Sequence, residues 1–199
     1  SDLGLTMPDA LSLHRMLASF VASGAEIVVM EASSIGLDQQ RLSGAQPSVA
    51  LFTNLSRDHL DYHGTEEAYA QAKMRLFAMP GLGAAVLNAD DPFSARALAQ
   101  LDPACAAIVY GETVHRLEHP GLRRLRCKRV EQRHNGLVIW VDGDFGEAQI
   151  ALPLIGRFNA MNALGVAAVW LALGMPLERV VQNLSALRPV PGRLQRVEP

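Results

Sequence analysis

The sequence has few cysteines and no apolar run long enough to cross a membrane. Its 199 residues include only two cysteines, Cys105 and Cys127, and these do not form a C-x-x-C pair. This argues against a disulfide scaffold or a zinc knuckle, and the composition suits a reducing cytosol. No signal peptide opens the chain. We therefore expect a cytoplasmic protein with no membrane partner.

A strong excess of charge of either sign is also missing. The formal net charge is -2, so nothing indicates a nucleic-acid partner. A short basic run from Arg123 to Arg129 is expected to be a solvated strand face. Apolar residues, by contrast, make up 49% of the chain, enough for one large domain with a sizeable core. Oligomeric state has no signature in the sequence.

Short apolar runs alternate with helical patterns in the first half of the chain. The runs have the length of buried strands and lie at residues 27–30, 49–52, 84–87 and 106–109. The helical patterns lie at about residues 9–22, 66–78 and 92–101. This alternation predicts an α/β fold with a mostly parallel sheet flanked by helices.

The pattern changes near residue 112. Three runs alternate in the manner of a β-meander, with a hairpin signal at Asn135-Gly136, and they lie at 122–130, 137–141 and 147–152. We therefore expect a small antiparallel β-sheet at about 112–155. Two helices are predicted after it, at about 159–173 and 177–187. Prolines and a glycine at 188–199 are typical of a linker.

Polar side chains follow the first two predicted strands. Glu31 to Ser34 come directly after the run at 27–30, and Asn54 to Gly64 come after the run at 49–52. Ligands of open parallel sheets bind at the carboxyl ends of the strands. Carboxylate, imidazole and hydroxyl groups together suit Mg²⁺ or Mn²⁺. The alternative, equally supported by spacing alone, is that the aspartates cap turns and His59 is a surface histidine.

Lys73 occupies an unusual position in the helix predicted at 66–78. It lies four residues from both Tyr69 and Phe77 and therefore shares the apolar face. Burial lowers the pKa of a lysine, and a neutral amine can react with CO₂ to give a carbamate, which is an oxygen ligand for metal. From the residues alone, a lysine that extends its amine to solvent is the favoured interpretation.

Two asparagines open the helix predicted at 159–173. Asn159 and Asn162 are three residues apart and share a face. An asparagine amide can donate to and accept from an adenine edge. Plain N-capping by Asn159 is an equally good interpretation.

These segments together resemble the Mur ligase family. The resemblance covers the chain from about residue 4 to its end, and it is closest to the branch that adds the third residue of the peptidoglycan stem peptide. The matching strings are Glu31-Ala-Ser-Ser-Ile-Gly-Leu37, Phe52-Thr-Asn-Leu-Ser-Arg-Asp-His-Leu-Asp-Tyr-His-Gly64, Ala72-Lys73, Gly156-Arg-Phe-Asn-Ala-Met-Asn162 and Arg188-Pro-Val-Pro-Gly-Arg193.

The resemblance implies roles for the matching positions. Glu31 and His59 would hold Mg²⁺, and Lys73 would be a carbamylated metal ligand and, with His59, catalytic. Residues that would contact UDP-MurNAc-L-Ala-D-Glu are Thr6, Met7 (through its backbone only), Ser33, Gln39 and Arg41. Residues that would contact the nucleotide are Asn159, Asn162 and Arg193.

The implied reaction is ATP-dependent amide-bond formation through an acyl phosphate. The incoming amino acid would be meso-diaminopimelate. Residues 1–187 would form a central domain of the P-loop NTPase type, and 188–199 would lead to a further domain. No G-x-x-x-x-G-K-S/T string occurs, so the family's phosphate loop is expected upstream of this segment, and the segment alone is expected to be inactive. The alternatives are a sibling Mur or folylpolyglutamate-type ligase, or a non-catalytic nucleotide-sugar binding module.

Overall fold

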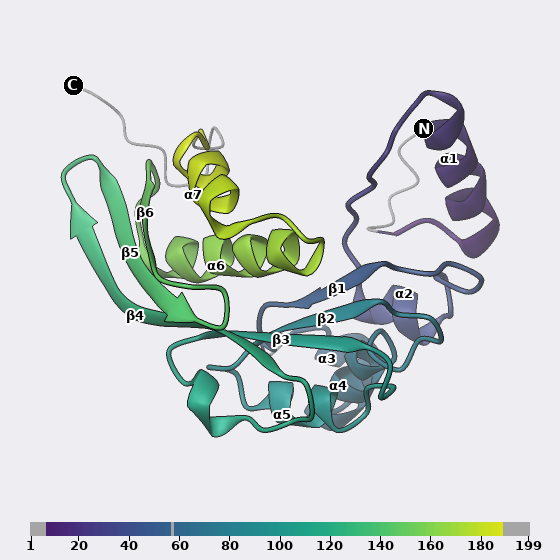
Figure 1. Cartoon of the computed structure of the whole chain (residues 1–199). Coiled ribbons are helices and arrows are strands. Elements are labelled where there is room, and N and C mark those ends of the chain that lie inside the picture. The colour runs from purple at the N-terminus through teal and green to yellow at the C-terminus, as the bar shows by residue number, and fades with distance from the viewer. Residues whose placement is uncertain (1–6, 57, 189–199) are drawn as a thin grey trace. The chain divides into compact units, whose positions relative to one another are not determined.

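The computed structural model describes residues 7–56 and 58–188, and the chain divides into two compact units (Figure 1). The first unit consists of Ser1–Ser48 and Leu55–Leu82, and the second of Val49–Asn54 and Gly83–Pro199. The chain therefore passes between the units three times. In the described part of the chain, no helix is both long and apolar enough to span a bilayer.

The second unit is built on one six-stranded sheet. Its strands are β1(Val49–Phe52), β2(Ala84–Asn88), β3(Ala106–Gly111), β4(Arg123–Arg133), β5(Gly136–Gly143) and β6(Ala148–Leu152). Neighbours in the sheet follow the order β1-β2-β3-β4-β5-β6. The pairs from β1 to β4 are parallel, and the pairs from β4 to β6 are antiparallel. The predicted mostly parallel α/β fold is confirmed.

The predicted antiparallel strands form the far part of this same sheet. β4 pairs in parallel with β3 over Arg123–Arg126, with Ile108 opposite Arg123, and pairs antiparallel with β5 over Leu125–Arg133. The hairpin between β4 and β5 closes with Arg133 opposite Gly136. Gly136 has φ 140°, and a Cβ there would lie 1.9 Å from the Leu152 carbonyl oxygen, so this corner requires glycine.

Helices cover the sheet of the second unit. α6(Arg157–Ala172) packs on β1 to β4, and α7(Leu177–Ser185) packs on β6; α5(Phe93–Leu98) lies on the opposite face from α6 (Figure 1). The short helix η1(Val114–Arg116) follows β3. α6 has apolar residues around most of its surface. Seven of its residues, all alanine, leucine or glycine, are buried, as expected of a core helix. Gly165 allows α6 to approach Tyr110 closely.

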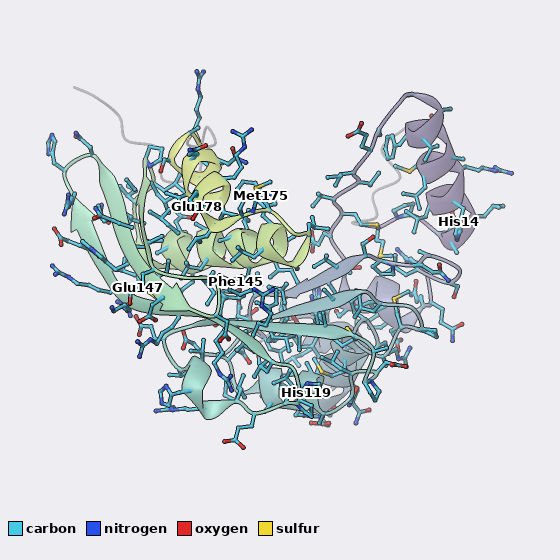
Figure 2. All side chains as sticks on the ribbon, in the orientation of Figure 1. His14, His119, Phe145, Glu147, Met175 and Glu178 are labelled. Atoms are coloured by element: carbon cyan, nitrogen blue, oxygen red, sulfur yellow. The ribbon has the colours of Figure 1, made fainter. Side chains whose placement is uncertain are left out.

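The first unit contains four helices within its described residues. They are α1(Ala10–Ala22), α2(Ser34–Asp38), α3(Leu60–His63) and α4(Glu66–Met74). Side chains of Asp9, Ser33 and Thr65 cap α1, α2 and α4 by accepting backbone N–H groups. A small core joins Met7 and Leu13 to Leu37 and Leu42. His14 of α1, labelled in Figure 2, places Nε2 2.9 Å from the Ser43 carbonyl oxygen.

The strand predicted at 27–30 is wrong. These residues form an extended segment without strand pairing in the described chain, and Ile27 is 71% and Val29 92% exposed. An apolar run predicts burial, but a strand also needs a hydrogen-bonded neighbour. In the described sheet β1 is an edge strand whose one neighbour is β2. The helices predicted at 66–78 and 92–101 exist but end earlier, at Met74 and Leu98.

Candidate functional site

Most of the predicted site residues lie in the first unit, around α2. Ser33 precedes this helix and is buried, and its hydroxyl oxygen accepts the Gly36 N–H at 3.1 Å. Ser34 is also buried, and its Oγ lies 3.0 Å from Nε2 of His63. The Ser33 hydroxyl therefore has a helix-capping role in addition to the predicted substrate role. The structure confirms where Ser33 lies; its contact with substrate stays a prediction.

The end of α2 places Gln39 and Arg41 on either side of a left-handed residue. Gln40 has φ 55°, and the Arg41 N–H donates to the Gly36 carbonyl oxygen at 2.8 Å. This arrangement is a Schellman ending, which normally has glycine at the left-handed position. The turn brings the two side chains together: Arg41 Nε donates to Gln39 Oε1 at 3.0 Å, and Arg41 NH1 donates to the Met7 carbonyl oxygen at 2.6 Å.

His59, the residue directly before α3, has an unusual backbone conformation. Its φ is 53°, a region that residues other than glycine visit at an energetic cost. Its backbone N–H donates to Asp58 Oδ1 at 2.8 Å, and its Nε2 lies 3.7 Å from Asp58 Oδ2. The His59 side chain is 41% exposed. The local hydrogen bond stabilises the turn, and the ring stays accessible to a ligand.

Tyr69 of α4 lies among the titratable side chains. It is 5% exposed, and its ring centre is 6.2 Å from that of His59 and 5.6 Å from that of His63. The Lys73 amine lies 5.9 Å from the same ring centre. Burial raises the pKa of the Tyr69 phenol, and the negative charge of Asp58 raises it further. This ring therefore links α3 with the part of α4 that carries Lys73.

Lys73 has the electrostatic setting predicted from its place on the apolar face. Burial lowers the pKa of its amine, while the carboxylates of Glu31 and Asp58 oppose that shift. The carboxylates of Glu31 and Asp58, the His59 imidazole and the Lys73 amine therefore lie in one region of the first unit. Among the described residues, no three His, Cys, Asp or Glu side chains gather closely enough to hold a metal ion. The carboxylates fit Mg²⁺ in chemistry, and water and substrate phosphate oxygens would complete its coordination.

The predicted nucleotide residues lie in the second unit, at the start of α6. Asn159 Nδ2 donates to the Ile155 carbonyl oxygen at 2.7 Å, so this amide is partly used in the helix entry. Asn162 lies one turn later and is exposed. Gly156 precedes the helix with φ 89°, and its N–H donates to Gln132 Oε1 at 3.2 Å. Arg157 pairs with Glu112. Contacts with adenine stay a prediction for both asparagines.

Two predicted site residues cannot be placed. Thr6 and Arg193 lie outside the described residues. Conversely, the sequence interpretation missed Tyr62, Asp38 and Arg75, which contact the Gln39–Arg41 pair or one another. Tyr62 stands inside the string from Asn54 to Gly64, but only the folded chain brings it near α2.

Comparison with known proteins supports the resemblance. The model of the Mur ligase middle domain matches residues 2–170. The UDP-N-acetylmuramoyl-L-alanyl-D-glutamate–2,6-diaminopimelate ligase of Ralstonia nicotianae is 44% identical over 194 residues, 97% of this chain and 38% of that protein. The ligase of the same name from Pseudomonas aeruginosa is 41% identical over 192 residues, again 38% of its length. This chain therefore spans well under half of these relatives.

Solved structures show the same fold. A structure of a ligase with that name superimposes with a TM-score of 0.85 at 32% sequence identity, over 96% of this chain and 39% of the other. MurF of Acinetobacter baumannii gives a TM-score of 0.62 at 24% identity over 77% of this chain and 32% of its own, which is a likeness of fold. The family model and the relatives agree over nearly the whole sequence, and the chain therefore belongs to the Mur ligase family.

Proposed function

We propose that this chain is the middle part of an ATP-dependent ligase of peptidoglycan precursor synthesis. Its reaction joins meso-diaminopimelate, as the third residue, to UDP-MurNAc-L-Ala-D-Glu. The support is the name shared by relatives that are 41–44% identical over almost the whole chain, together with the side chains gathered around α2 and α4. Because ATP and UDP-linked sugars are cytoplasmic metabolites, we place the reaction in the cytoplasm.

The proposed chemistry has two steps. A substrate carboxylate attacks the γ-phosphorus of ATP, so that an acyl phosphate forms and ADP leaves. The amine of the incoming amino acid then attacks the acyl carbon, and phosphate leaves as the amide bond forms. Gln39 and Arg41 donate hydrogen bonds to the anionic UDP-linked substrate, and Asn162, with Asn159, binds the adenine edge. These residues position the reacting groups.

The observation that carries the proposal is the position of Lys73 on α4, where its amine lies 5.9 Å from the centre of the buried Tyr69 ring. The pKa of the Lys73 amine is lowered by burial, which increases the fraction of neutral amine at a given pH. That amine attacks CO₂, a nitrogen–carbon bond forms, a proton leaves the nitrogen, and a carbamate anion remains. The carbamate would add a further anionic oxygen ligand for a metal ion. Glu31, His59 and this carbamate would hold Mg²⁺, which would neutralise charge on the transferring phosphoryl group.

The proposal is tested with the full-length protein. Phosphate release from ATP should require both UDP-MurNAc-L-Ala-D-Glu and the amino acid, and the product should gain the mass of one diaminopimelate residue. L-Lysine, offered in its place, separates this specificity from that of a sibling ligase. A Lys73→Ala variant measures the background, which is the phosphate release that does not depend on Lys73. Phosphate release that does not depend on the UDP-linked substrate would contradict the ligase. Binding of that substrate without any turnover would also contradict it and would favour a nucleotide-sugar binding module.

A further inference from the structure

A continuous set of hydrogen bonds links α4 to the end of α2 in the first unit. The Tyr62 hydroxyl stands at its centre: it accepts a hydrogen bond from Gln39 Nε2 at 3.2 Å and donates one to Asp38 Oδ2 at 3.0 Å. Asp38 in turn is held by Arg75, whose NH1 lies 3.1 Å from Asp38 Oδ1 and donates to the Asp38 carbonyl oxygen at 2.8 Å. The Tyr62 hydroxyl therefore connects the ion pair of Asp38 and Arg75 to the Gln39 amide through hydrogen bonds.

The other side of the Gln39 amide is occupied by Arg41. Gln39 Oε1 accepts from Arg41 Nε at 3.0 Å and from Arg41 NH2 at 2.5 Å, which uses both lone pairs of that oxygen. Gln39 Nε2 uses one of its two hydrogens on Tyr62. These contacts orient the amide with its oxygen toward Arg41 and its nitrogen toward Tyr62, and they leave one N–H free to donate.

Arg41 is held in the same manner. Three of its five N–H groups are engaged, two by Gln39 and one by the Met7 carbonyl oxygen. Two N–H groups remain. The pair therefore offers only hydrogen-bond donors, which matches a carboxylate or phosphate oxygen and leaves no acceptor for a neutral donor group of a ligand.

From this geometry we propose that Tyr62 is a positioning residue for substrate binding. Its hydroxyl anchors the Gln39–Arg41 pair to Asp38 and Arg75, so that the pair presents donors to an anionic group of the substrate in one fixed arrangement. Preorganised donors bind more tightly because less freedom is lost on binding. The inference rests on the proposed function, because that function supplies the anionic substrate, but the hydrogen bonds stand on the structure alone.

The ring and the hydroxyl of Tyr62 have separable contacts. The ring packs against the His63 ring, with centres 4.8 Å apart, whereas the hydroxyl bonds to Gln39 and Asp38. Tyr62→Phe therefore keeps the ring contact and removes the anchor. The matched control is Gln71→Ala, which removes an exposed amide whose Nε2 donates to Glu67 Oε1, one turn earlier on α4.

The first test is kinetic and uses the full-length protein. Loss of one neutral hydrogen bond is worth about 3- to 10-fold, so Tyr62→Phe should raise KM and Kd for UDP-MurNAc-L-Ala-D-Glu by that factor, with kcat and KM for ATP nearly unchanged. In a Gln39→Ala background the same change should have almost no effect. An equal effect in both backgrounds, or an equal rise in KM for ATP, would overturn the positioning role.

The second test does not depend on turnover. Nitrogen-15 relaxation of the Gln39 side-chain amide should report a rigid group in the unmodified protein and a mobile one in Tyr62→Phe, while Gln71 is mobile in both. Equal rigidity with and without the hydroxyl overturns the inference even if the ligase activity is confirmed. A rigid-to-mobile change in a protein that lacks ligase activity supports the anchor and rejects only the proposed function.

Discussion

The Lys73 amine lies 5.9 Å from the centre of the Tyr69 ring, one helical turn earlier on α4. Two influences therefore act on this amine in opposite directions. An aromatic face favours an ammonium ion, and so do the carboxylates of Glu31 and Asp58, but burial favours the neutral amine and is the largest of the effects on its pKa. The net result is that the pKa of Lys73 is lower than that of an ordinary lysine.

This balance predicts how stability depends on pH. Because the Lys73 pKa is lower in the folded protein than its ordinary value of 10.5, the unfolded chain binds the proton more tightly. The lysine therefore destabilises the fold at neutral pH, and its penalty disappears as pH rises from the lowered pKa to 10.5. Lys73→Met should raise the free energy of unfolding at pH 7, without metal or CO₂, and the gain should shrink toward pH 10.5.

Urea titrations at several pH values measure this effect. The control is Lys128→Met, because Lys128 is the one other lysine of the sequence and its side chain is 43% exposed and ion-paired. That variant should show no gain at pH 7. A Lys73→Met protein that is less stable than the unmodified protein at pH 7 would show that the amine is not penalised by burial.

The carbamate proposal predicts chemical rescue. Lys73→Ala should reduce turnover of the full-length enzyme by more than about 100-fold, since it removes a proposed metal ligand. Added formate or acetate should restore part of the activity by placing a carboxylate in the vacated space. Lys73→Arg should not be rescued, because it keeps a cation there. Rescue of both variants alike would point to a general salt effect.

The proposed metal ligands predict a change in Mg²⁺ dependence. Glu31→Ala and His59→Ala should each raise the Mg²⁺ concentration needed for half-maximal turnover and lower kcat by more than about 100-fold, while Kd for the UDP-linked substrate changes little. Glu26→Ala and His115→Ala are controls, because both side chains are exposed and neither is a proposed ligand. Turnover at limiting Mg²⁺ equal to that of the controls would remove that residue from the ligand set.

The left-handed residue Gln40 predicts a stabilising substitution. A side chain at φ 55° is strained, and glycine removes that strain at a helix ending of this type. Gln40→Gly should raise the free energy of unfolding by up to about 1 kcal/mol, measured by urea titration. Gln40→Ala keeps a Cβ and is the control. If both changes have the same effect, the left-handed conformation is not populated in solution.

Local patterns predicted much of this fold. The strands β1, β2 and β3 and the hairpin of β4 and β5 lie where apolar runs and Asn135-Gly136 place them. The run at 27–30 failed because apolarity indicates what a residue prefers to bury but not which strand it pairs with. Lys73 was found because three- and four-residue spacing reveals a charged residue on an apolar helix face.

The contacts of Tyr62 could not be predicted in the same manner. Its hydroxyl bonds to residues 23 and 24 positions away in the sequence, and neither helical nor strand periodicity carries information over that separation. Asn159 shows the opposite limit: its amide bonds to Ile155, only four residues earlier. Spacing left capping and ligand binding as equal alternatives there, and the structure shows that part of the amide is already used locally.

The division of the chain has a consequence for how the protein folds. β1 belongs to the second unit, but β2, with Ala84 opposite Val49, arrives only after residues 55–82 have contributed to the first unit. Pairing of β1 with β2 therefore closes a loop that contains residues 55–82, a segment of the first unit. Closing this loop costs chain entropy before the contacts between β1 and β2 form. During synthesis β1 therefore emerges without a sheet partner and stays unpaired until residues 55–82 and then β2 have followed it, so the sheet of the second unit forms only after the last segment of the first unit has been made.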